Sequence, residues 1–62
     1  MFKLMAKINS KAKTLKGINT AIEKEFGDQN LCYENEAALS KAEKEGFIKV
    51  NANSIEIWED SI

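Results

Sequence analysis

Few side chains in this 62-residue chain can do acid–base or nucleophilic chemistry. Histidine, the commonest general base in enzymes, is absent. Cys32 is the single cysteine, so it has neither a disulfide partner nor a histidine that would activate it. Glu34 with Glu36, and Glu59 with Asp60, could each form a carboxylate pair. One thiol with scattered carboxylates does not match a zinc-ligand pattern. We therefore expect no enzyme activity, no metal site and no cofactor.

The residues best suited to binding lie near the end of the chain, in a segment that predicts a β-hairpin. Two runs with period-2 alternation, 47–50 and 55–58, flank an asparagine-containing loop at 51–54. Such cross-strand pairing is the unit of sheet stabilisation. Folding the chain back at the loop gives four facing pairs: Val50 with Ile55, Lys49 with Glu56, Ile48 with Ile57, and Phe47 with Trp58.

One face of this hairpin is aliphatic, and the other carries an opposite-charge pair and an aromatic pair. If the aliphatic face packs on helices, the second face is outward, and an exposed tryptophan is typical of a protein-binding hot spot. The alternative is that the two aromatic side chains tuck under the N-terminal segment or Ile62. The expected protein-binding surface consists of Phe47, Lys49, Glu56, Trp58, Glu59 and Asp60.

A first helix is predicted upstream of the hairpin by an apolar stripe at helical spacing. The stripe is Leu15, Ile18, Ile22 and Phe26, with Ala12 and Ile8 extending it backward. Gly27 stands where a left-handed C-cap belongs, and we expect Asn9 or Ser10 to cap the start. Gly17 inside the helix costs about 1 kcal/mol relative to alanine.

Two short segments are ambiguous. Residues 1–8 alternate as a strand would, but Leu4, Met5 and Ile8 also continue the helical stripe. We favour the helical continuation, because no loop signal precedes Asn9, and keep a short strand that pairs with the hairpin as the alternative. The apolar run 31–33 predicts a brief strand or an extended entry to the next helix.

A second helix is predicted from Asn35 to Glu45. Asn35 is a good N-cap and Glu36 suits the positive end of the helix dipole. Gly46 predicts a second C-cap, after which Phe47 folds back onto Ala42 as in a Schellman motif.

These elements predict a single α+β domain over residues 1–62, with two helices packed on a small antiparallel sheet around the C-terminal hairpin. The expected core is Ile8, Leu15, Ile18, Ile22, Phe26, Leu39, Ile48, Val50, Ile55 and Ile57. A domain this small usually needs a disulfide, a metal or a partner chain. We therefore expect a partner protein, with a homodimer as one form of it.

Charge and composition refine this expectation. Residues 1–24 carry six lysines and one acid, whereas residues 25–62 carry three lysines and nine acids. Such asymmetry indicates either a basic face or an acidic face for a partner. No apolar run is long enough for a membrane span, and a single free cysteine favours the reducing cytoplasm.

The second half of the chain resembles the last helix and wing of winged-helix DNA-binding domains. The segment 38–50, a helix ending in glycine and followed by a hydrophobic strand, carries the resemblance together with 54–57. It implies major-groove contacts from Ser40, Lys41 and Lys44, with Lys11 and Lys13 as further phosphate contacts. The acidic balance of residues 25–62 disfavours this interpretation, because phosphate neutralisation supplies much of the affinity for DNA.

Our leading hypothesis is a non-enzymatic binding module that occupies a surface of a partner protein. The chain is small and acidic in balance, lacks catalytic groups, and is rich in lysine, asparagine and isoleucine, whose codons are rich in A and T. In these respects it resembles small accessory proteins of bacteriophages, which include inhibitors of host enzymes. That resemblance implies a bacterial host protein as partner and acidic side chains that imitate phosphates. The candidates are Glu34, Glu36, Glu43, Glu45, Glu56, Glu59 and Asp60. The alternatives are a winged-helix-like DNA-binding regulator and a structural subunit of a larger assembly.

Overall fold

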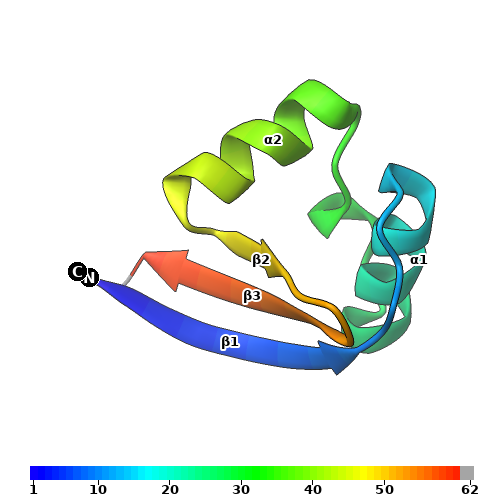
Figure 1. Cartoon of the computed structure of the whole chain (residues 1–62), viewed down its shortest axis with the longest axis horizontal. Helices are drawn as coiled ribbons and strands as arrows, with labels where there is room; N and C mark the ends of the chain where they lie inside the picture. The colour runs from blue at the N-terminus through cyan, green and yellow to red at the C-terminus, as the bar shows by residue number, and fades with distance from the viewer. Residues whose placement is uncertain (61–62) are drawn as a thin grey trace.

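The computed structural model describes residues 1–60 and shows an α+β fold with two helices and a three-stranded antiparallel sheet. Figure 1 shows α2 across one side of the sheet and α1 at its far end. The predicted fold class and the C-terminal hairpin are therefore confirmed. The elements in chain order are β1 (Phe2–Asn9), α1 (Leu15–Phe26), η1, a 3-10 turn (Gln29–Leu31), α2 (Glu36–Glu45), β2 (Ile48–Val50) and β3 (Ser54–Asp60).

The hairpin forms in the predicted register. Ile48 lies opposite Ile57, Lys49 opposite Glu56, and Val50 opposite Ile55. At the loop, the Asn51 N–H donates to the Ser54 carbonyl at 2.8 Å, which closes the turn. The ladder then extends one residue beyond β2, where the Trp58 N–H donates to the Phe47 carbonyl at 2.8 Å. The order of strands is β1-β3-β2, so β3 is the central strand.

The helical continuation favoured for residues 1–8 is wrong, and the strand alternative is correct. β1 pairs with β3 along its length and sets Lys3 opposite Glu59 and Lys7 opposite Glu56. Both periodicities fit this segment. Pairing with β3 decides between them because it satisfies the backbone groups and sets both lysines opposite acidic residues. A β-bulge at Met5 shifts the register between Leu4 and Ala6.

The start of α1 also differs from expectation. The N-cap is Thr14, whose hydroxyl accepts from the Gly17 N–H at 3.2 Å, and not Asn9 or Ser10. Glycine suits position 17 because a Cβ there would lie 3.0 Å from the Ala12 Cβ, closer than an ordinary contact, so that the Ala12 segment would have to shift. Gly27, with φ of 68°, ends the helix as predicted.

The connection between the helices is tied to α1 by one side chain. The Asn19 amide donates to the Tyr33 carbonyl at 2.8 Å and accepts from the Tyr33 N–H at 2.9 Å. The apolar run 31–33 is not a strand: Leu31 ends η1, and Cys32 follows in extended conformation. Asn35 caps α2 as predicted, accepting from the Ala38 N–H at 2.8 Å.

The core lies between the two helices and one face of the sheet. The buried hydrophobic residues are Ile8, Ile18, Ile22, Leu39, Ala42, Ile48 and Ile55. Four expected core residues, Leu15, Phe26, Val50 and Ile57, are only partly buried around that cluster. Ala42 joins the core because its small side chain lets α2 approach the sheet closely.

Candidate functional site

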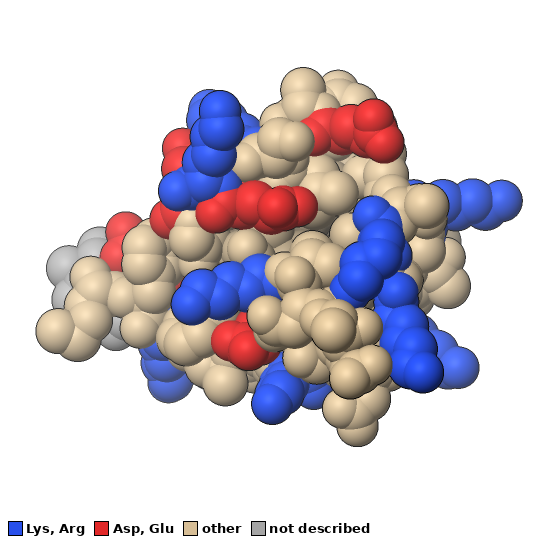
Figure 2. All heavy atoms as spheres, in the orientation of Figure 1, with Lys and Arg blue, Asp and Glu red and all other residues tan. Residues whose placement is uncertain are grey.

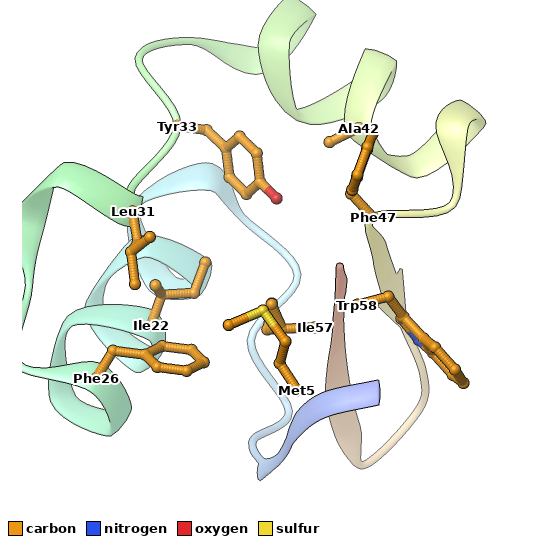
Figure 3. A pocket seen from close by; sticks show the side chains of 9 residues that line it. All are labelled: Met5, Ile22, Phe26, Leu31, Tyr33, Ala42, Phe47, Ile57 and Trp58. Atoms are coloured by element: carbon orange, nitrogen blue, oxygen red, sulfur yellow. The ribbon is translucent and has the colours of Figure 1, made fainter. Parts of the chain in front are cut away.

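An open apolar pocket lies beside the core, between the helices and the sheet. Its volume is about 270 Å³. Figure 3 shows the nine side chains that line it, from all parts of the fold. They are Met5, Ile22, Phe26, Leu31, Tyr33, Ala42, Phe47, Ile57 and Trp58. Apart from the tyrosine hydroxyl and the indole nitrogen, these side chains offer only hydrocarbon, sulfur and aromatic surface, so the pocket suits an apolar group.

Two large side chains at this pocket remain in contact with solvent. Met5 is 46% exposed and Leu31 is 44% exposed. The β-bulge re-aims the Met5 side chain, which in Figure 3 points from β1 toward the middle of the pocket. Leu31, which belongs to η1, lies on the side of the pocket opposite β1. Exposed hydrophobic residues beside a hollow mark a surface that another molecule can cover.

Tyr33 is the residue that brings a hydroxyl group to the pocket. Figure 3 shows its ring pointing inward from the connection between η1 and α2. Burial, with a smaller contribution from the negative charge of Glu43, raises the pKa of the Tyr33 hydroxyl above its ordinary value. The phenol is therefore uncharged at neutral pH and can form a hydrogen bond with whatever enters the pocket.

Phe47 and Trp58 do not share the outward face expected from the hairpin pattern. Phe47 points toward Ala42 on the helix side in Figure 3, whereas the indole of Trp58 points away from the pocket. The cause is the Schellman turn at Gly46, in which the Phe47 N–H donates to the Ala42 carbonyl at 2.9 Å. The Phe47 ring also meets the ring of Phe2 edge-on, with centroids 5.1 Å apart.

Trp58 is half-buried on the outer face of the sheet, beside its cross-strand partner Leu4. The Lys49 ammonium lies 5.6 Å from the indole centroid, in cation–π contact. The Trp58 Nε1 is buried and has no hydrogen-bond partner among the residues that the structure describes. Ile62, proposed above as a cover for the aromatic side chains, lies outside those residues.

The acidic residues of β3 each face a positive group. Glu56 lies between Lys7 on one strand and Lys49 on the other, and accepts from the Asn51 amide at 3.0 Å. Glu59 lies opposite Lys3. Asp60 forms an ion pair with the N-terminal ammonium at 3.7 Å. The structure thus brings Lys49, Glu56 and Trp58 together on the outer face and moves Phe47 to the pocket.

The residues expected for DNA contact fall into two groups on different elements. Ser40, Lys41 and Lys44 are exposed on α2. Lys11 and Lys13 lie in the connection from β1 to α1, where the Lys13 ammonium donates to the Asn51 carbonyl. Figure 2 shows lysines gathered at that end of the molecule, whereas around α2 lysines and acids are mixed.

The candidate chemical groups remain apart. Among residues 1–60, no three histidine, cysteine or acidic side chains gather as metal ligands would. Cys32 is half-buried, and its thiol donates to the Asn19 carbonyl at 3.4 Å. Glu34 and Glu36 are both exposed.

Sequence reasoning did not identify most of the pocket, although it expected several of these residues in the core. The residues it missed as binding residues are Met5, Ile22, Phe26, Leu31, Tyr33, Ala42 and Ile57. One signal was present: Met5 is an apolar residue at a position where the alternation of Leu4 and Ala6 requires a polar one, and a bulge produces such a break.

Within residues 1–60, every helix is too short or too polar to cross a bilayer. Comparison with known proteins gives no match, whether with a protein family, a characterised protein or a solved structure.

Proposed function

We propose that this protein is a non-enzymatic binding module that acts by occupying a surface of another protein. The open apolar pocket, with Met5 and Leu31 exposed beside it, carries the proposal. A partner's apolar side chain that enters the pocket removes Met5 and Leu31 from water. The Tyr33 hydroxyl then orients that side chain's segment by a hydrogen bond. Trp58 borders the same pocket, but its indole lies on the outer face of the sheet, where it offers a separate aromatic contact of the kind enriched in hot spots.

The acidic residues support a more specific form of this proposal, inhibition by imitation of phosphates. Those of β3 lie opposite Lys3, Lys7 or Lys49 on the neighbouring strands, or form an ion pair with the N-terminus. Of the acids considered as phosphate mimics, those away from the strand lysines lie on the second helix and in the residues before it. They are Glu34, Glu36, Glu43 and Glu45, all exposed. In this form the partner is a bacterial host protein with a basic groove, and the single free thiol supports action in the cytoplasm.

DNA binding is the second candidate, and the exposure of Ser40, Lys41 and Lys44 on α2 favours it. The nearby acids and the nine-residue connection 27–35 oppose it, because a helix-turn-helix uses a turn of about three or four residues. Titration of duplex DNA at low salt separates the two candidates. A mobility shift that disappears steeply as salt rises supports DNA binding, and no shift at low salt removes it.

Capture of partners from a nuclease-treated bacterial lysate tests the leading proposal. Met5→Glu and Leu31→Glu each place a charge beside the apolar pocket, and we expect each to reduce capture at least about tenfold, because an unpaired charge is costly to bury. Ala52→Glu is the matched control, because it adds the same charge in the exposed hairpin loop. Circular dichroism checks that each variant folds. Equal capture by folded pocket variants and the control contradicts the proposal.

Sedimentation over a range of concentrations addresses the remaining alternative, a structural subunit. Self-association that Leu31→Glu abolishes would identify a second copy as the occupant of the pocket.

A further inference from the structure

The outer edge of β1 is the longest unpaired strand edge among residues 1–60. β1 has eight residues and lies at one side of the sheet, whereas the other edge strand, β2, has three. Figure 1 shows no helix or strand along this outer edge. Backbone N–H and C=O groups that point away from β3 there can pair with an added strand.

The same strand carries most of the exposed large hydrophobic side chains. Phe2, Leu4 and Met5 are each more than two-fifths exposed. Leu4 lies beside Trp58 on the outer face, whereas Met5 reaches the pocket on the other face. An added strand covers both faces at once, because its successive side chains alternate between them.

The charges on β1 specify which strand fits. Its charged side chains are Lys3 and Lys7, with no acid between them. On the paired edge of β1, Glu56 and Glu59 of β3 lie opposite the two lysines. Two apolar residues separate these glutamates in the sequence. A segment with the pattern acid, apolar, apolar, acid therefore complements the side chains of β1.

A second copy of the chain does not fit this edge. Pairing β1 with another β1 joins two strands that each carry two lysines and no acid, and like charges on paired strands are destabilising. The complementary segment of a second copy is in β3, whose two edges are already occupied.

We propose that the free edge of β1 binds an extended acidic segment of a partner protein by strand addition, with the apolar residues of that segment covering Met5 and Leu4. This inference rests on the proposed function, protein binding, and specifies the chemistry of the partner. Main-chain hydrogen bonds supply the affinity, and the lysines and the pocket select the sequence.

Titration of ¹⁵N-labelled protein with synthetic peptides tests the inference. The first peptide repeats residues 54–60 of the chain with both ends blocked, and the second replaces its two glutamates at positions 56 and 59 by lysine. We expect the first to shift the amide signals of residues 2–9 and the second to bind at least about tenfold more weakly. In two further peptides, alternate backbone N–H groups are methylated, so that each peptide loses the hydrogen-bond donors of one of its two edges. We expect binding only by the peptide that keeps the donors on the edge facing β1, since the other cannot form the ladder.

Each alternative result overturns strand addition. Equal affinity of the glutamate and lysine peptides removes the charge selection. Binding by both N-methylated peptides would show that no backbone ladder forms. Amide signal shifts confined to α2 would place the binding site elsewhere. Concentration-dependent shifts of residues 2–9 without peptide would identify a second copy as the occupant. The capture assay with Met5→Glu and Leu31→Glu reports separately on protein binding itself, so either proposal can fail alone.

Discussion

Gly46 decides at a single residue how α2 is joined to the sheet. Its φ of 91° lies in the left-handed region, and the turn directs the Phe47 N–H to the Ala42 carbonyl. A Cβ at this position would lie 3.4 Å from the Phe2 ring. Gly27 has a similar conformation, with φ of 68°, but a Cβ there would meet no atom within 4 Å. Substitution of either glycine therefore strains the backbone in the same way, and the two sites differ only in whether the added Cβ contacts a neighbour.

We predict that Gly27→Ala lowers the free energy of unfolding by about 1 kcal/mol, from left-handed strain alone. Gly46→Ala is expected to cost a similar amount, about 1 kcal/mol, because the left-handed strain is the same and the added Cβ would meet the Phe2 ring at an ordinary van der Waals distance. Urea denaturation followed by the fluorescence of the single tryptophan measures both. A clearly larger loss for Gly46→Ala than for Gly27→Ala would contradict this expectation and show that the Phe2 ring resists the added methyl group.

At the scale of elements, one side chain holds the connection between the helices in place. The side-chain amide of Asn19, on α1, accepts a hydrogen bond from the Tyr33 N–H and donates one to the Tyr33 carbonyl, as the backbone of a paired strand would. Both backbone groups belong to the segment that supplies Leu31 and Tyr33 to the pocket. The geometry of the candidate site therefore depends on an amide in the neighbouring helix.

Asn19→Ala should lower the free energy of unfolding by about 2 kcal/mol, because it leaves two partly buried backbone groups without partners. Hydrogen exchange should become faster for the amide of Tyr33. Thr20→Ala is a matched control on the same helix: its hydroxyl bonds the Lys16 carbonyl at an exposed position, so a change within about 0.5 kcal/mol is expected. Unchanged exchange at Tyr33 in Asn19→Ala would contradict this role.

At the scale of the whole molecule, the pocket is where packing is incomplete. Sheet, η1 and both helices contribute to it, and its wall includes the core residues Ile22 and Ala42. The environment of the pocket alters the ionisation of Tyr33: burial and the charge of Glu43 raise the pKa of its hydroxyl. The folded state therefore holds the phenolic proton more tightly than the unfolded chain does.

This shift predicts an alkaline loss of stability. Because the pKa in the folded state is raised, the contribution of Tyr33 is complete below the unfolded pKa of about 10 and is lost as pH rises through the folded value. Tyr33 is the only tyrosine, so phenolate absorbance reports its titration directly. Tyr33→Phe serves as the reference that lacks the phenol, and it should flatten the fall in stability at alkaline pH. Identical alkaline profiles would contradict the prediction.

The parts of the fold that could be predicted are those that depend on residues close in sequence. The register of Ile48 with Ile57 and the caps at Asn35 and Gly46 are of this kind, and all are confirmed. The candidate site was less accessible to such reasoning. Of the surface expected from the hairpin, Phe47 and Trp58 border the pocket, whereas Met5 and Leu31 come from distant segments whose meeting no local pattern encodes.

The sequence by itself determined the hairpin, the helix 36–45 and the α+β class, because alternation and capping act over a few residues. Only the tertiary structure decided that residues 2–9 form a strand, since their apolar spacing suits a helix as well and the choice depends on β3 at the other end of the chain. It also decided the direction of Phe47, where the turn at Gly46 prevails over hairpin alternation. Long-range pairing and packing select among conformations that local propensities leave nearly equal in free energy.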